Sequence, residues 1–157
     1  MAEELLKIRL TVNGREYEVG LGGSELLIDV LRDRLGLKSV KEGCGEGDCG
    51  LCLVIADGVP IHSCLVMAFQ ADGKKITTVE GLGDGENLHP IQRAFIDVGA
   101  VQCGYCIPAA ILAAKHLIDT TKNPSREEIR RALRSVLCRC GSYIRFEQAI
   151  LKVVGKT

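Results

Sequence analysis

The chain has 157 residues, 46% of them hydrophobic, which suits one ordinary domain or two small ones. Its 20 basic and 20 acidic side chains balance, so no net charge favours nucleic acid or an anionic membrane as a partner. There is no apolar run of about 18 residues, and the start, Met1-Ala-Glu-Glu-Leu-Leu6, lacks the features of a leader, so we expect a cytoplasmic protein.

The first pattern along the chain is that of a hairpin and a helix. Residues 7–12 and 15–19 alternate polar and apolar side chains on either side of Asn13-Gly14, a pair typical of a tight β-turn. Ser24 can then cap a helix that ends at Gly36. The apolar residues expected on one face of this helix are Leu27, Val30, Leu31 and Leu35.

A second hairpin is expected after a loop rich in glycine and cysteine. Residues 51–56 and 60–63 flank the turn pair Asp57-Gly58, and residues 75–79 can supply one further strand. The first 80 residues therefore read as strands with one packed helix.

Beyond residues 80–86 the apolar residues recur at helical spacing. The pattern predicts a helix near residues 91–98, another near 111–117, a third from the capping box Ser125-Arg-Glu-Glu128 to about Leu137, and a last one over residues 145–154. The third contains a charged stretch typical of a solvated face, which can also contact a partner: Glu127, Glu128, Arg130, Arg131 and Arg134. The fold class is α+β, with domains over residues 1–82 and 83–157.

Eight cysteines in such a chain, without a secretory leader, favour metal or redox chemistry over disulfides. The first four follow the pattern C-x4-C-x2-C with one further cysteine after eleven residues, the spacing of plant-type [2Fe–2S] sites; they are Cys44, Cys49, Cys52 and Cys64. Glycines in the loop let backbone N–H groups approach the sulfurs. A zinc site, which uses two short knuckles, is the alternative. A G-x-G-x-x-G also occurs here, but without the strand and helix of a dinucleotide site.

The second set pairs C-x2-C, before Pro108, with C-x-C after the capped helix: Cys103, Cys106, Cys138 and Cys140. The first two lie at the start of one expected helix and the last two beyond the end of another, so an antiparallel bundle can bring them together. Taken alone, this set fits zinc, an iron–sulfur cluster or a redox dithiol.

Three segments together resemble the small iron–sulfur subunit of the xanthine oxidase family of molybdenum hydroxylases. They are Gly43-Cys-Gly-Glu-Gly-Asp-Cys-Gly-Leu-Cys52, Gln102-Cys-Gly-Tyr-Cys106 and Leu137-Cys-Arg-Cys140, and the resemblance covers nearly the whole chain. It implies an N-terminal β-grasp domain like plant-type ferredoxins, a C-terminal four-helix-bundle domain, and one [2Fe–2S] cluster in each. It also implies partners: a large molybdopterin-binding subunit and, in most relatives, a medium FAD-binding subunit.

The resemblance also implies roles for single residues. The set from Cys103 to Cys140 binds the cluster nearer molybdenum, the set from Cys44 to Cys64 binds the one nearer flavin, and Gln102 and Cys140 approach the pterin. The run Cys138-Arg-Cys-Gly-Ser-Tyr143 differs from the common Cys-Arg-Cys-Thr-Gly-Tyr and is closer to isoquinoline and aldehyde oxidoreductases, some of which lack a flavin subunit. The final electron acceptor therefore stays open.

The expected function is electron transfer in a molybdenum hydroxylase or dehydrogenase, with no catalytic residue on this chain. A free-standing ferredoxin-like carrier and a zinc-stabilised interaction module are the alternatives from other classes. A lone carrier has no need of the helical half, which favours the subunit. The substrate is set by the large chain.

Overall fold

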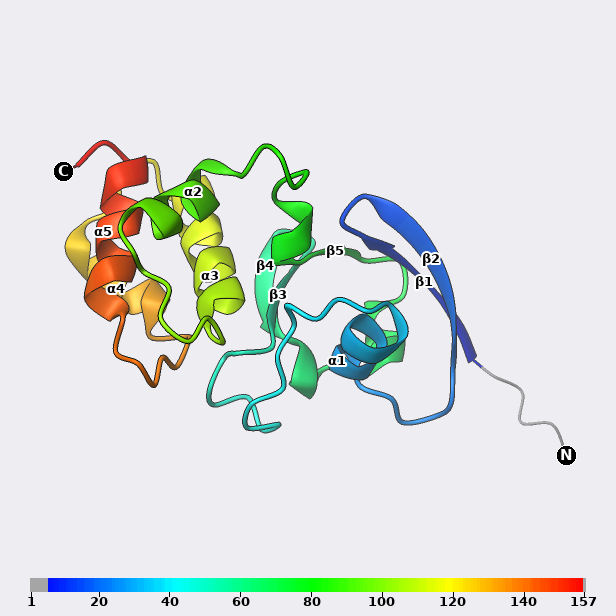
Figure 1. The fold of residues 1–157 in the computed structure, drawn as a ribbon. Coiled ribbons are helices and arrows are strands. Elements are labelled where there is room, and N and C mark those ends of the chain that lie inside the picture. The colour runs from blue at the N-terminus through cyan, green and yellow to red at the C-terminus, as the bar shows by residue number, and fades with distance from the viewer. Residues whose placement is uncertain (1–5, 157) are drawn as a thin grey trace, which may run out of the picture.

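The computed structural model describes residues 6–156, so residues 1–5, part of the stretch on which the leader argument rests, lie outside it. Two halves lie side by side (Figure 1): a sheet with helix α1 against one face, and a group of helices from α2 to α5. Strands come first along the chain and most helices follow, so the predicted α+β class is confirmed. Within residues 6–156, no helix is long and apolar enough to cross a bilayer.

The sheet has five strands in the order β2-β1-β5-β3-β4. The pair β1 and β5 is parallel and the other neighbouring pairs are antiparallel. The strands are β1 (Leu6–Val12), β2 (Arg15–Leu21), β3 (Leu53–Ala56), β4 (Val59–His62) and β5 (Lys75–Thr77). Both predicted hairpins are present, with Asn13 and Asp57 at φ values of 52° and 48°, as tight turns with left-handed residues require.

The first helix differs from its prediction at the start. Helix α1 (Leu27–Asp29) continues as a π-helical turn over Val30–Arg34 and ends before Gly36, whose φ is 73°. Ser24 does not cap it: the N-cap is Leu26, whose backbone N–H donates to the Asp29 carboxylate over 3.1 Å. Of the four apolar residues predicted to face the core, Leu27, Val30 and Leu31 are fully buried, and Leu35 is partly buried against the same core.

The helices of the second half lie at the positions predicted from the spacing of apolar residues, but their first and last residues differ from the prediction. They are α2 (Pro90–Asp97), α3 (Ile107–Thr120), α4 (Arg126–Leu133) and α5 (Tyr143–Val153). The capping box at Ser125 and Glu128 is confirmed. The prediction that this helix reaches about Leu137 is wrong, because the chain turns away after Leu133 to contact the other half, as described below.

Strand β3 joins the two cores because its side chains alternate between the faces of the sheet. Val54 and Ala56 face the core beneath α1, whereas Leu53 and Ile55 belong to the helical core, which centres on Phe95 and Phe146. All four β3 residues are buried. The two halves therefore share a packed interface.

Candidate metal centres

The first cysteine set is gathered by one loop and one hairpin. Cys44, Cys49 and Cys52 belong to the loop before β3, and Cys64 lies in the short 3-10 turn after β4. The register of the hairpin pairs Leu53 with His62, so the residues flanking that pair also come together. The sulfurs of Cys52 and Cys64 are consequently 3.3 Å apart.

The other two cysteines of this set also form a pair. The N–H of Cys44 donates to the Cys49 sulfur and the N–H of Cys49 donates to the Cys44 sulfur, each over 3.3 Å. Donors from Cys49 and Glu46 lower the pKa of Cys44 to about 7, which favours the thiolate that binds metal. Gly43 is required here because a Cβ on it would lie 2.6 Å from the Cys49 sulfur.

Cys52 has the opposite environment. It is 2% exposed, and burial, together with the nearby Cys64 thiol, raises its pKa to about 11. A proton bound there is expected to leave only when a cation replaces it, because coordination deprotonates a thiol. The Ser63 hydroxyl donates to the carbonyl oxygen of Cys52 over 2.7 Å and fixes the backbone between β3 and the loop.

The second set lies where the start of α3 meets the end of α4. Cys106 is the N-cap of α3, and Cys138 follows α4 after a short turn. The thiols of this set lie close enough to shift the pKa values of their neighbours, with Cys138 acting most strongly on Cys106 and Cys140 on Cys103. Burial and the neighbouring Cys138 raise the pKa of Cys106 to about 12. Backbone donation from Tyr105 and the contact with Cys140 lower the pKa of Cys103.

Residues after α4 hold Cys138 in place. Burial opposes ionisation, but N–H donation from Ser142, over 3.4 Å, helps to lower the pKa of Cys138 overall. The Tyr143 hydroxyl accepts from the N–H of Cys138 over 2.7 Å and donates to the carbonyl of Val136 over 3.1 Å. In the sequence, nothing beyond the position of Tyr143 in the cysteine motif indicates this role.

In both cysteine sets, each thiol therefore lies close to another thiol of the same set. A [2Fe–2S] cluster needs two thiolates on each iron, so the donor type and the pairing fit a two-iron cluster in each set. The paired arrangement favours a two-iron centre over the four-thiolate zinc alternative.

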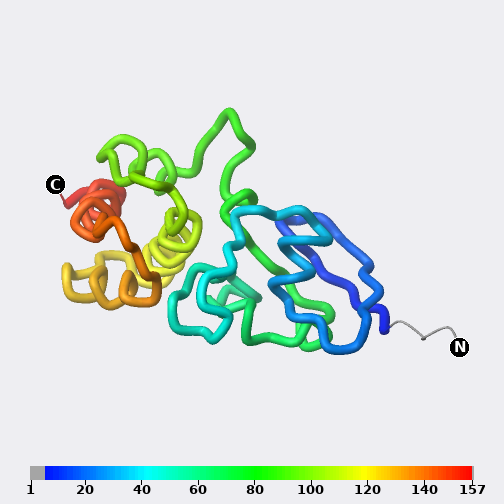
Figure 2. Tube along the Cα trace, turned by 60° about the horizontal axis from the view of Figure 1, so that its bottom comes forward, coloured from blue at the N-terminus to red at the C-terminus, as the bar shows by residue number. Residues whose placement is uncertain are grey.

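The two sets are joined by backbone contacts. The N–H of Leu137, next to Cys138, donates to the carbonyl of Cys49 over 2.8 Å. Beside it, a Cβ on Gly50 would lie 1.6 Å from the Ser135 carbonyl oxygen, so only glycine fits. Figure 2 shows the loop of the first set, in cyan, against the helical half.

A second contact between the two sets comes from the C-x2-C segment. The Tyr105 hydroxyl donates to the carbonyl of Glu42 over 2.7 Å, and Lys41 lies over the Tyr105 ring. The helical half therefore holds the first cysteine loop at both of its ends, at residues 41–42 and 49–50.

The sets differ in exposure. Cys49, Cys52 and Cys64 are buried, whereas Cys103 and Cys140 are exposed. Gln102 is also exposed, and its amide nitrogen donates to the hydroxyl of the buried Ser142 over 3.0 Å. The second set therefore opens onto the surface, amid the exposed apolar side chains of Val101, Tyr105, Leu137 and Ile144.

Two family models match the chain. Residues 10–80 match the 2Fe-2S iron-sulfur cluster binding domain, and residues 78–151 match the [2Fe-2S] binding domain. The two together cover almost all of the described chain, one for each half.

Whole proteins are similar as well. The chain is 43% identical to the nicotinate dehydrogenase small FeS subunit of Eubacterium barkeri, over 96% of each chain. It is 46% identical to part of the aldehyde oxidoreductase of Megalodesulfovibrio gigas, over 90% of this chain but 16% of that longer one. A chain in the crystal structure of quinoline 2-oxidoreductase from Pseudomonas putida 86 superposes with a TM-score of 0.88 at 35% identity, covering 98% of both chains.

Proposed function

This chain belongs to the xanthine oxidase family of molybdenum hydroxylases and is a small iron–sulfur subunit of that family. From this premise we propose which of its residues bind the clusters and how they support electron transfer. The chain is an electron-transfer subunit of an oxidoreductase, and the reaction with substrate takes place on another chain. Bound [2Fe–2S] clusters supply one-electron carriers. The protein holds these carriers, insulates them from water and fixes their separation.

The pairing of the thiols is the observation that carries the ligand assignment. Cys44 and Cys49 bind one iron of the first cluster, and Cys52 and Cys64 bind the other. In the second cluster the pairs are Cys103 with Cys140 and Cys106 with Cys138. Backbone N–H groups directed at Cys44, Cys49 and Cys138 stabilise the negative charge that each centre carries.

The finer architecture belongs to the same proposal. We assign the first half to a β-grasp domain, supported by the two hairpins, the parallel β1–β5 pair and α1 on the sheet. We assign α2 to α5 to a four-helix bundle, supported by their shared core. The division between residues 82 and 83 falls in the connection between strand β5 and helix α2.

The surface around the exposed Cys103 and Cys140 of the second set faces the large chain. Cys140 and Gln102 are accessible there, as contact with a molybdopterin on that chain requires. The aldehyde oxidoreductase of Megalodesulfovibrio gigas carries a matching region within one long chain, which supports such proximity. Electrons leave through the first set toward an FAD-bearing subunit or another acceptor. A cytoplasmic setting is part of the proposal, because reducing surroundings keep the thiols free for cluster assembly.

The substrate class follows from the named relatives. Nicotinate and quinoline are nitrogen heterocycles, and the third enzyme is named for aldehydes. We therefore assign the complex to the oxidation of a heteroaromatic ring or an aldehyde, with the choice made by the large chain.

Metal analysis of the purified complex tests the core of the proposal. Eight thiols in two complete sets predict four irons and four acid-labile sulfides for each copy of this chain. Stoichiometric zinc without labile sulfide would contradict it. A native preparation in which this chain is an active free monomer would instead support the ferredoxin-like carrier.

A further inference from the structure

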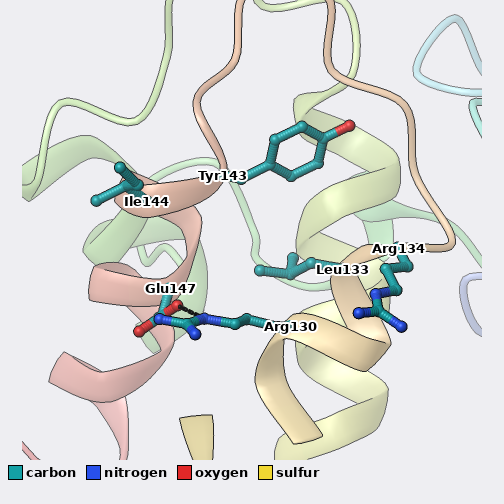
Figure 3. A pocket seen from close by; sticks show the side chains of 6 residues that line it. All are labelled: Arg130, Leu133, Arg134, Tyr143, Ile144 and Glu147. Carbon is teal, nitrogen blue, oxygen red and sulfur yellow. Dashed lines mark hydrogen bonds and ion pairs between the residues drawn. The ribbon is translucent and has the colours of Figure 1, made fainter. Parts of the chain in front are cut away.

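A surface pocket of about 500 Å³ lies between the end of α4 and the first turns of α5. Figure 3 shows that its side chains come from both helices, with Ile144 at one side and Arg134 at the other. Its lining residues are Arg130, Leu133, Arg134, Tyr143, Ile144 and Glu147. None of these is a ligand of the two proposed clusters.

The charge of the pocket is positive. Glu147, whose side chain is 9% exposed, forms ion pairs with Arg126 and with Arg130, whose Nε lies 2.8 Å from the Glu147 carboxylate. These arginines hold the pKa of Glu147 below its usual value and neutralise its charge. Arg134 makes no ion pair within residues 6–156, so its guanidinium is available to a ligand.

The opposite side of the pocket is apolar. Leu133 forms a buried wall, while Ile144 is 74% exposed, more than any other large apolar side chain of the described residues. An exposed isoleucine beside an unpaired arginine fits a partner that presents an apolar side chain next to a carboxylate. Free anions would gain nothing from Ile144, and an apolar ligand alone would leave Arg134 unused.

The pocket also adjoins the exposed second cysteine set. Tyr143 lines the pocket, and its hydroxyl accepts from the backbone N–H of Cys138. Leu137 and Cys140, within two residues of Cys138 in the chain, are exposed. We propose that this pocket is an anchor point for the large molybdenum-binding chain, which inserts a segment bearing an Asp or Glu for Arg134 and an apolar side chain for Ile144. This inference rests on the proposed function.

Co-purification of molybdenum provides the test. The full chain, tagged, is expressed in its own organism, and molybdenum and iron are measured in the eluate at increasing dilution. Ile144→Asp and Arg134→Glu should each weaken retention of molybdenum by at least about tenfold, which corresponds to about 1.4 kcal/mol, as expected for residues that anchor an interface. Their iron content should stay at the wild-type level, because neither residue binds a cluster.

Matched variants control for a general change of charge or polarity. Ile96, 54% exposed on α2, and Arg131, on α4 but outside the pocket and paired with Glu127, provide Ile96→Asp and Arg131→Glu. Both should retain molybdenum as the wild type does. If the pocket variants behave like these controls, the anchor does not exist. If the wild-type chain itself brings down no molybdenum, the proposed function fails instead.

Photo-crosslinking identifies the occupant. A photoreactive amino acid in place of Ile144 should give an adduct with a peptide of the molybdenum-binding chain that contains an acidic residue. An adduct with a second copy of this chain, or with a different subunit, would overturn the assignment.

Discussion

At the scale of single residues, Glu147 is the clearest structural charge. It lies among buried neighbours on α5, and two arginines of α4 hold its carboxylate, which ties those helices together. The arginines stay mostly exposed, so they lose little hydration in the pairing. The ion pair between Arg131 and Glu127 has both side chains in solvent and is expected to matter little.

Replacing Glu147 and Glu127 in turn distinguishes the half-buried ion pairs of Glu147 from the exposed ion pair of Glu127. Glu147→Gln should lower stability by about 1–3 kcal/mol, as expected for lost hydrogen bonds to a charged group, whereas Glu127→Gln should change it by less than about 1 kcal/mol. The stability of both variants is measured by urea unfolding, with the visible absorbance of the clusters as the signal. Equal midpoints for the two variants would contradict this account.

The pH dependence has a definite sign. The pKa of Glu147 is lower in the folded protein than in the unfolded chain, so its contribution is complete above the unfolded value of about 4.3. The contribution is lost as the pH falls through the folded value. The difference between wild type and Glu147→Gln should therefore be constant near neutral pH and shrink only in acid.

At the scale of elements, the contact between the cysteine loop and the segment after α4 fixes how the two halves meet. Gly50 and Ser135 touch through their backbones, and the hydrogen bond from Leu137 to Cys49 runs beside them. This bond joins Cys49, a proposed ligand of the first cluster, to Leu137, the neighbour of the proposed ligand Cys138, and we propose it as a short path for an electron between the clusters.

Gly50→Ala tests that contact, with Gly45→Ala as its control. Both glycines have positive φ values, 67° and 71°, but a Cβ on Gly45 meets nothing within 4 Å. Each variant should carry the strain of a left-handed alanine, about 1 kcal/mol. Gly50→Ala should lose a further 1–3 kcal/mol or so through overpacking, and its Leu137 amide should exchange faster with solvent. Similar urea midpoints and exchange rates in the two variants would show that the contact is unimportant.

At the scale of the whole molecule, we propose a direction of electron flow, because only the second set has exposed cysteines. Electrons should enter at the helical half, where Cys103 and Cys140 reach the surface, and leave through the sheet half. The two environments differ in burial and in hydrogen bonds to sulfur, so the two clusters should give distinguishable EPR signals.

Ligand variants test the direction. Cys106→Ser should block transfer at the first step within this chain, so that substrate no longer reduces the sheet-half cluster. Cys49→Ser should disturb the sheet-half cluster while substrate still reduces the helical one. Rapid-freeze EPR of the complex follows both. Reduction of the sheet-half cluster at the normal rate in a Cys106→Ser protein lacking the helical cluster would show that the order is wrong.

The sequence by itself determined the features that depend on neighbours in the chain. Turn pairs such as Asn13-Gly14 and the capping box at Ser125 act over a few residues, and these local predictions agree with the structure. The spacing could not decide between zinc and iron for the second set. The match of residues 78–151 to the [2Fe-2S] binding domain favours iron, and the fold brings Cys106, at the start of α3, and Cys138, after α4, to the same place.

Only the tertiary structure decided the features made by residues far apart. The early end of α4, the need for glycine at position 50 and the parallel pairing of β1 with β5 all depend on segments that meet only in the folded chain. The cap expected at Ser24 failed for the same reason: the N–H of Leu27 bonds to the carbonyl of Val66, so contact with a distant segment sets where the helix begins. Local preferences of about 1 kcal/mol yield to such packing.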